Sequence, residues 1–177
     1  MRLNKILAIL TFPGIIVHEW AHKTMCNLFN IKVYKVNYLS LRGNINGYVL
    51  HDKPENYFQA FLISVGPLFL NSLIAIIFTF IALNFYIENT FIFSLLLWIS
   101  FSVGLHAFPS NGDADSLLSY SKACLKKWYN PLNLLHLLTF PIALIIWIMN
   151  KLKYFGVDIV YAIFLICIII NIWKNYN

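Results

Sequence analysis

The chain has 177 residues, of which 60% are hydrophobic and only 11% are charged, and its formal net charge is +6. A soluble domain usually has about half apolar and about a quarter charged residues. This composition therefore argues against a soluble domain and predicts a polytopic membrane protein. The positive charges lie between apolar runs rather than in one basic patch. That distribution argues against a nucleic-acid-binding surface and indicates membrane topology.

Five apolar runs are long enough, or nearly long enough, to cross a bilayer, for which a helix needs about 20 residues. They cover about residues 3–26, 57–85, 90–109, 131–150 and 155–173. We therefore expect an all-α membrane protein with about five transmembrane helices in a single domain, residues 1–177. The first three runs form the expected core, residues 1–118. Residues 119–177 add two further transmembrane helices.

The segment between the first two runs has a different character. Residues 31–50 mix β-branched and aromatic residues with polar ones, and Gly43, Asn44, Asn46 and Gly47 are turn-forming. We expect a small membrane-associated β-hairpin at about residues 31–50. An irregular loop is the alternative.

The lysines and arginines predict how the chain is oriented. If the five runs alternate in direction, 4 of these 13 residues lie on the side of the N-terminus and 9 on the other side. The positive-inside rule makes the second side cytoplasmic, so we expect the N-terminus outside and the C-terminus in the cytoplasm. The start of the chain resembles a signal peptide, with Arg2 and Lys5 before an apolar stretch. No small-x-small cleavage site follows, so we expect it to be retained.

The sequence "HEWAH" at the end of the first run matches the pattern HExxH, with His18, Glu19 and His22. On a helix the two histidines share a face, so both imidazoles can bind one metal ion. Zinc favours imidazole nitrogen, and a catalytic zinc has three protein ligands and a water. Glu19 can then act as the general base toward that water. Ionisable groups at bilayer depth mark function, although a helix that ends at the interface is the alternative.

A third ligand is expected from residues 104–118, where the third run ends. Asp113 and Asp115 follow it on the same side of the membrane as the HExxH, so topology brings these groups to the same depth. A carboxylate oxygen is an ordinary zinc ligand. For either aspartate alone, a helix-capping role in the turn "SNGD" is the alternative.

At this point the sequence resembles a known family. "HEWAH", "SVGPLFLN" at 64–71 and the aspartate after "HAFPS" are similar to the motifs of the site-2 protease family of intramembrane zinc metalloproteases. "GYV" at 47–49 resembles the membrane-associated strand region of that family. The resemblance covers about residues 12–118. It implies one zinc ion held by His18, His22 and an aspartate, within the membrane but nearer its cytoplasmic face.

The sequence departs from the family pattern at two points. His106 stands where the family has an asparagine, and Asp113 is followed by Ala114 rather than glycine. "HAFPS" followed by Gly-Asp-Ala resembles a compact branch of the family and favours Asp113 over Asp115. Asn71 matches the asparagine after Gly-Pro. Asn71 or His106 could donate a hydrogen bond to the oxyanion, a helix–helix hydrogen bond is the alternative for Asn71, and His106 could also bind or support the zinc.

Together these features predict an intramembrane zinc metalloprotease, a zinc metalloendopeptidase with Glu19 as the general base. The expected partners are the lipid bilayer and a transmembrane or membrane-associated protein substrate, and no nucleic acid is expected. A metal-ion transporter or metal-binding membrane protein is the first alternative, because intramembrane His and Asp also suit an ion path. An inactive protease-like membrane scaffold is the second.

Overall fold

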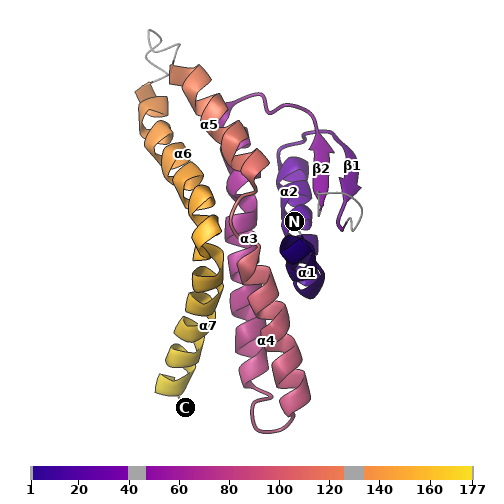
Figure 1. The fold of residues 1–177 in the computed structure, drawn as a ribbon. Coiled ribbons are helices and arrows are strands. Elements are labelled where there is room, and N and C mark those ends of the chain that lie inside the picture. The colour runs from indigo at the N-terminus through magenta and orange to yellow at the C-terminus, as the bar shows by residue number, and fades with distance from the viewer. Residues whose placement is uncertain (1, 40–46, 126–133, 177) are drawn as a thin grey trace.

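The computed structural model describes residues 2–39, 47–125 and 134–176, which are mostly helical with one small antiparallel sheet (Figure 1). The elements in chain order are α1 (Arg2–Leu10), α2 (Phe12–Leu28), β1 (Val33–Asn37), β2 (Tyr48–His51), α3 (Tyr57–Leu83), α4 (Thr90–Leu105), α5 (Asn111–Leu125), α6 (Leu134–Leu152), the short 3-10 helix η2 (Lys153–Phe155) and α7 (Val157–Tyr176). The expectation of a mainly helical chain with a small hairpin is therefore confirmed.

The first apolar run forms two helices, so the expectation of one continuous helix over residues 3–26 is wrong. The break lies at Thr11, because Pro13 in the first turn of α2 has no N–H and its ring would clash with the preceding turn of a continuous helix. The Thr11 hydroxyl donates to the Leu7 carbonyl at 2.7 Å, which closes the end of α1. The HExxH consequently lies in the middle of α2 rather than at the end of a long span.

The hairpin forms as expected between the first two runs. β1 and β2 pair antiparallel, with Val36 opposite Val49 and Asn37 opposite Tyr48, and an irregularity lies between Val33 and Lys35. The strands reach one residue beyond the expected range, to His51. Of the expected turn residues, Gly43, Asn44 and Asn46 lie outside the described residues.

Helix α3 is central, since it packs against α2, α4, α5 and α7. The contact between α2 and α4 depends on Gly14, because a Cβ atom there would lie 2.0 Å from the Ser102 carbonyl oxygen. The Ser102 hydroxyl accepts from Gly14 N–H at 2.8 Å and donates to the Thr11 carbonyl at 2.9 Å. This serine therefore braces the break between α1 and α2, where the Gly14 N–H also donates to the Thr11 carbonyl at 3.2 Å.

The last two helices differ from the expected pair of alternating spans. α6 packs against α5, whereas α7 packs against α3 and α4. The turn between them is made by η2 and Gly156, whose φ of 78° suits glycine. Figure 1 shows α6 and α7 following one another in the same direction. The C-terminus therefore lies at the end of the bundle that holds the α3–α4 turn, and the expected alternation is wrong for this pair.

Two helices in the described part of the chain, α3 and α7, are long and apolar enough to cross a membrane by length and composition. α4 is apolar but has only 16 residues, below the roughly 20 that a full span needs. α5 is a further helix that the division into apolar runs did not anticipate, because its sequence is largely polar.

We expect the substitution Gly14→Ala to destabilise the fold by about 1–3 kcal/mol, because the added methyl group overlaps the α4 backbone. Gly112→Ala is the matched control, since a Cβ there meets only the Ser110 hydroxyl, at 3.7 Å. The measurement is the free energy of unfolding in detergent. Equal stability of the two variants would contradict the close packing of α2 on α4.

Candidate metal centre

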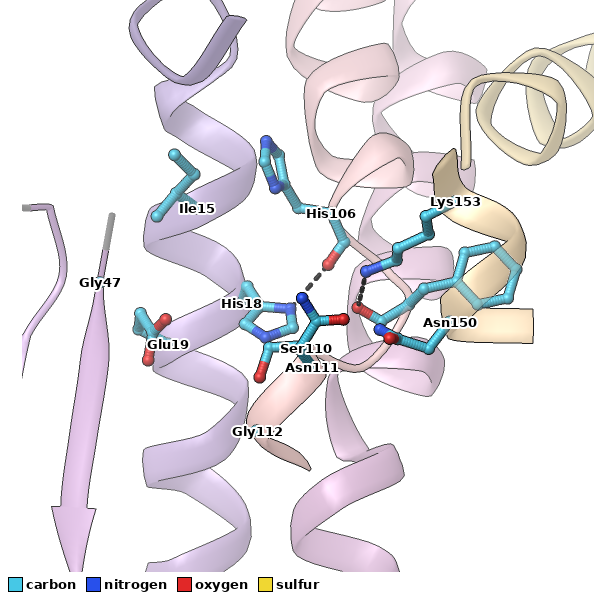
Figure 2. Close-up of a pocket in the computed structure, with 11 residues that line it drawn as sticks. Ile15, His18, Glu19, Gly47, His106, Ser110, Asn111, Gly112, Asn150 and Lys153 are labelled. Carbon is cyan, nitrogen blue, oxygen red and sulfur yellow. Dashed lines mark hydrogen bonds between the residues drawn. The ribbon is translucent and has the colours of Figure 1, made fainter. Parts of the chain in front are cut away.

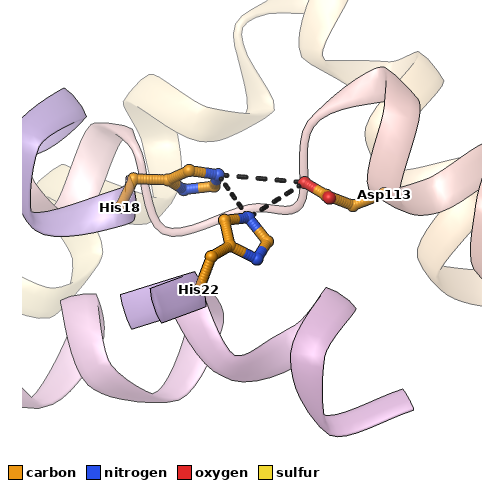
Figure 3. Close-up of side chains that lie close together, drawn as sticks. All are labelled: His18, His22 and Asp113. Carbon is orange, nitrogen blue, oxygen red and sulfur yellow. Dashed lines mark hydrogen bonds and ion pairs between the residues drawn. The ribbon is translucent and has the colours of Figure 1, made fainter. Parts of the chain in front are cut away.

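Three side chains from two distant segments converge beside α2. His18 and His22 lie one turn apart on its buried face, and Asp113 reaches them from the first turn of α5 (Figure 3). The Nε2 atoms of the histidines are 3.1 Å apart, and Asp113 Oδ2 lies 3.2 Å from His22 Nε2 and 3.9 Å from His18 Nε2. The structure thus brings together the three expected ligands.

The other nitrogen of each imidazole is held by a backbone carbonyl. His18 Nδ1 donates to the His106 carbonyl oxygen at 2.7 Å, and His22 Nδ1 donates to that of Ile63 at 2.9 Å. Each neutral imidazole has one N–H, so both Nε2 atoms then present lone pairs to one another and to the Asp113 carboxylate. Three acceptors facing each other require a cation between them, either a proton on one ring or a metal ion. Metal-bound histidines have this same second hydrogen bond.

Asp113 has two roles, because it also caps α5. Its Oδ2 accepts from the Ser110 N–H at 2.9 Å and from the Ser110 hydroxyl at 2.6 Å, while Asp113 N–H donates to that hydroxyl at 3.2 Å. This reciprocal pair is a capping box. Burial alone would raise the pKa of the Asp113 carboxyl, but its interactions with His22 and His18 hold this pKa well below its usual range, since a cation shared among the three groups favours the charged carboxylate. The ligand and capping alternatives for Asp113 are therefore compatible.

The donor set suits zinc. Two imidazole nitrogens and one carboxylate oxygen are an ordinary catalytic zinc set, and bonds of about 2.0–2.2 Å in a tetrahedron separate ligand atoms by about 3.3 Å. Two of the three separations in this cluster, 3.1 and 3.2 Å, are close to that value, and the third, 3.9 Å, is wider. The histidines are buried and Asp113 is partly exposed, which leaves one side of the cluster open to a cavity.

Glu19 lines this cavity. Its side chain is buried, yet in the described part of the chain its carboxylate has no hydrogen-bond or ion-pair partner. Gly47, just before β2, makes room for it, because a Cβ at residue 47 would lie 2.7 Å from Glu19 Cγ. A cavity of about 160 Å³ is lined by Glu19, by the three cluster residues and by β2. Glu19 is thus an uncommitted carboxylate beside the cluster.

The other two expected site residues act behind the cluster. Asn71 is fully buried, and its Nδ2 donates to the carbonyls of Val103 and His106 at 3.3 and 3.1 Å. It therefore makes the helix–helix hydrogen bonds that were its alternative reading, and it shares the His106 carbonyl with His18. The His106 ring does not join the cluster, because its Nε2 donates to the Thr11 hydroxyl at 2.8 Å.

Asp115 lies away from the cluster. Its Oδ1 accepts from the Trp147 indole N–H at 2.8 Å, so this carboxylate connects α5 with α6. On a helix, residues two apart point to different sides. The geometry therefore separates the two aspartates that the sequence left as alternatives.

A second and larger cavity, of about 610 Å³, lies next to His18 and Glu19 (Figure 2). Asn150 of α6 and Lys153 of η2 line it, although both lie outside the expected core of residues 1–118. The Lys153 ammonium donates to the carbonyls of Phe108 and Pro109 at 3.0 and 2.9 Å. The signal in the sequence that could have indicated them is two polar residues at and just after the end of the apolar run 131–150. His51 is a further residue missed there, since it lines the smaller cavity.

Comparisons with protein-family models, with curated proteins and with solved structures find no match to this chain.

We expect the purified protein to contain about one zinc ion per chain, and His22→Ala and Asp113→Asn to reduce this to background. Asparagine keeps an oxygen for the capping box but loses the charge, so loss of zinc would reflect coordination rather than unfolding. Asp115→Asn is the matched control and should retain zinc. The measurement is metal analysis after purification in detergent without chelators. A metal-free wild-type protein would assign the cation of the cluster to a proton.

Proposed function

We propose that this chain is an intramembrane zinc metalloprotease similar to the site-2 protease family, which hydrolyses peptide bonds of membrane-embedded protein substrates. The observation that supports it best is the convergence of His18, His22 and Asp113 next to the Glu19 carboxylate, which has no polar partner among the described residues. A metal-binding scaffold would need the first three groups but not the fourth.

In this proposal each residue of the site has a distinct role. Zinc, when bound, supplies Lewis-acid activation that lowers the pKa of a water toward about 7. Glu19 removes a proton from water in the cavity and returns it to the amine of the leaving peptide. The carbonyls of His106 and Ile63 hold the imidazoles with Nε2 facing the cluster. Asn71 positions the first of these carbonyls and is thus a positioning residue.

The exposure of α7 supports the location in a membrane. Only 11% of its most apolar 18-residue stretch is buried, and large apolar side chains cover the outside of the helix. Soluble proteins rarely expose apolar surfaces of that extent. We place the end of the bundle that holds the hairpin and the C-terminal end of α5 in the cytoplasm, because Lys35 of β1 and Lys122 in the last turn of α5 lie there. The C-terminus then lies on the opposite side, unlike the expectation from alternating spans.

The hairpin offers a way to bind an unwound substrate. Asp52 N–H donates to the Lys32 carbonyl at 3.0 Å. Because N–H groups alternate along an antiparallel strand, those of Val49 and His51 point to the free edge of β2. β2, and not β1, lines the cavity with Glu19 and the cluster. An extended peptide paired with this edge would pass beside the cluster.

A metal transporter is the main rival, and Glu19 separates the two functions. We expect Glu19→Gln to lower peptide cleavage by roughly a hundredfold or more while zinc content stays unchanged, because only hydrolysis needs a general base. The assay uses vesicles that contain the chain with extracted membrane proteins, with new peptide termini identified by mass spectrometry. Zinc uptake is followed in the same vesicles. Uptake by both wild type and Glu19→Gln, without cleavage by either, would favour transport.

A proline at the free edge tests substrate capture. We expect Val49→Pro to lower cleavage without altering zinc content, because it removes an edge N–H but no bond to β1. Val49→Thr, which keeps the N–H and the branched side chain, is the control. Unchanged cleavage by Val49→Pro would show that the substrate does not pair with β2.

A further inference from the structure

The larger cavity beside the metal centre has a built polar wall opposite α2. Figure 2 shows Lys153 and Asn150 across the cavity from α2, on the side of that helix where His18 lies. Ile15 and Glu19 of α2 also line the cavity. The start of α5, with Ser110, completes this wall. The general base and this wall thus enclose the same space.

Among residues 2–39, 47–125 and 134–176, Lys153 has no anionic partner. Its two recorded hydrogen bonds go to backbone carbonyls, and the described chain offers no carboxylate within ion-pair distance. An ammonium carries three donors, so one N–H remains. Burial lowers the pKa of the Lys153 ammonium, while Asp158 and Asp113 work in the opposite direction from farther away. Charges taken out of water are normally paired, which points to an anion supplied from outside the chain.

Asn150 belongs to the same wall. It is only 3% exposed, and its Nδ2 donates to the Pro109 carbonyl at 2.7 Å. Its Oδ1 is buried and has no partner among residues 2–39, 47–125 and 134–176. Because that oxygen is closed to solvent, Asn150 supports the wall by holding the Pro109 carbonyl beside Lys153. Lys153 is then the donor that this wall presents.

The start of α5 contributes a third element. Ser110 N–H and Asp113 N–H are used by the capping box, and Ala114 N–H by the Ser110 carbonyl. The remaining N–H groups of the first turn belong to Asn111 and Gly112, both of which line the cavity. Free N–H groups and the helix dipole at this position favour a negative charge.

We propose that this cavity is a carboxylate-recognition site, in which Lys153 and the first turn of α5 bind a carboxylate of the peptide substrate. A peptide offers this group as its terminal carboxylate or as the side chain of Asp or Glu. That the ligand is a peptide rests on the proposed function. The site selects acidic or carboxyl-terminal sequence next to the bond that is cleaved.

The test is binding, measured in detergent on full-length protein carrying Glu19→Gln so that no peptide is consumed. The probes are acetyl-Leu-Leu-Leu with a free carboxylate, its terminal amide, and acetyl-Leu-Glu-Leu amide. We expect at least one carboxylate peptide to bind about tenfold or more tightly than the neutral amide, as a hydrogen bond between charged groups would give. Which one binds identifies the source of the carboxylate. Equal binding of all three would overturn the proposal.

Variants separate Lys153 from the metal centre. We expect Lys153→Met to abolish the preference and Lys153→Arg to retain it. Lys151→Met is the matched control, because Lys151 is exposed and its ammonium lies 5.2 Å from the Trp147 ring. The preference should also survive in His22→Ala. A preference that persists in Lys153→Met, or disappears in His22→Ala, would assign the carboxylate to the metal centre and sink the proposal.

These outcomes are distinct from those that bear on proteolysis. Binding needs no turnover, so a chain that never cleaves a peptide could still show the preference. A protease could equally lack it. If Lys153→Met fails to fold, the comparison of the three peptides on the Glu19→Gln protein, with and without His22→Ala, still decides the question.

Discussion

The arrangement of this molecule around its centre follows from one electrostatic constraint. Two imidazoles whose N–H groups are committed to backbone carbonyls point lone pairs at each other across 3.1 Å, with a carboxylate oxygen beside them. Such a cluster is repulsive until a cation enters it. The carbonyls that impose this tautomer come from α3 and from the end of α4, so the packing of three helices fixes the chemistry of two side chains. Metal sites depend in the same way on the groups behind their ligands.

Support for the centre continues outward from there. The His106 carbonyl accepts from both His18 and Asn71, and the His106 ring is tied to Thr11 at the break between α1 and α2. The same break is held by Ser102, against which Gly14 packs. A single connected network thus joins the centre to the kink in the first apolar run. Residues that resemble catalytic groups in the sequence turn out to be the framework that positions the imidazoles.

The cluster was predictable from the sequence because it depends on a local spacing and on the order of the apolar runs. The spacing of His18 and His22 fixes their common face, and apolar run lengths bring Asp113 to the same depth. The hairpin was likewise readable from its turn residues. The break at Thr11 was not predicted, because the length of an apolar run does not show whether a proline within it, here Pro13, divides the helix. The course of the last two helices could not be read at all, because run lengths say nothing about whether a connection reverses the chain. Alternating runs would place Lys153 on the side of the N-terminus, away from the expected zinc site.

Because Asp113 belongs both to the cluster and to the cap of α5, the stability of the centre and the stability of α5 are coupled. The oxygen that faces the imidazoles is also the oxygen that closes the capping box with Ser110. Any cation that binds only the folded form stabilises it, by about 2.7 kcal/mol at a hundredfold excess over its dissociation constant. Because Asp113 caps the first turn of α5, part of that free energy would stabilise α5. It would also stabilise α6, which packs on α5. Binding of such a cation would thus stabilise a region of the chain far larger than the site itself.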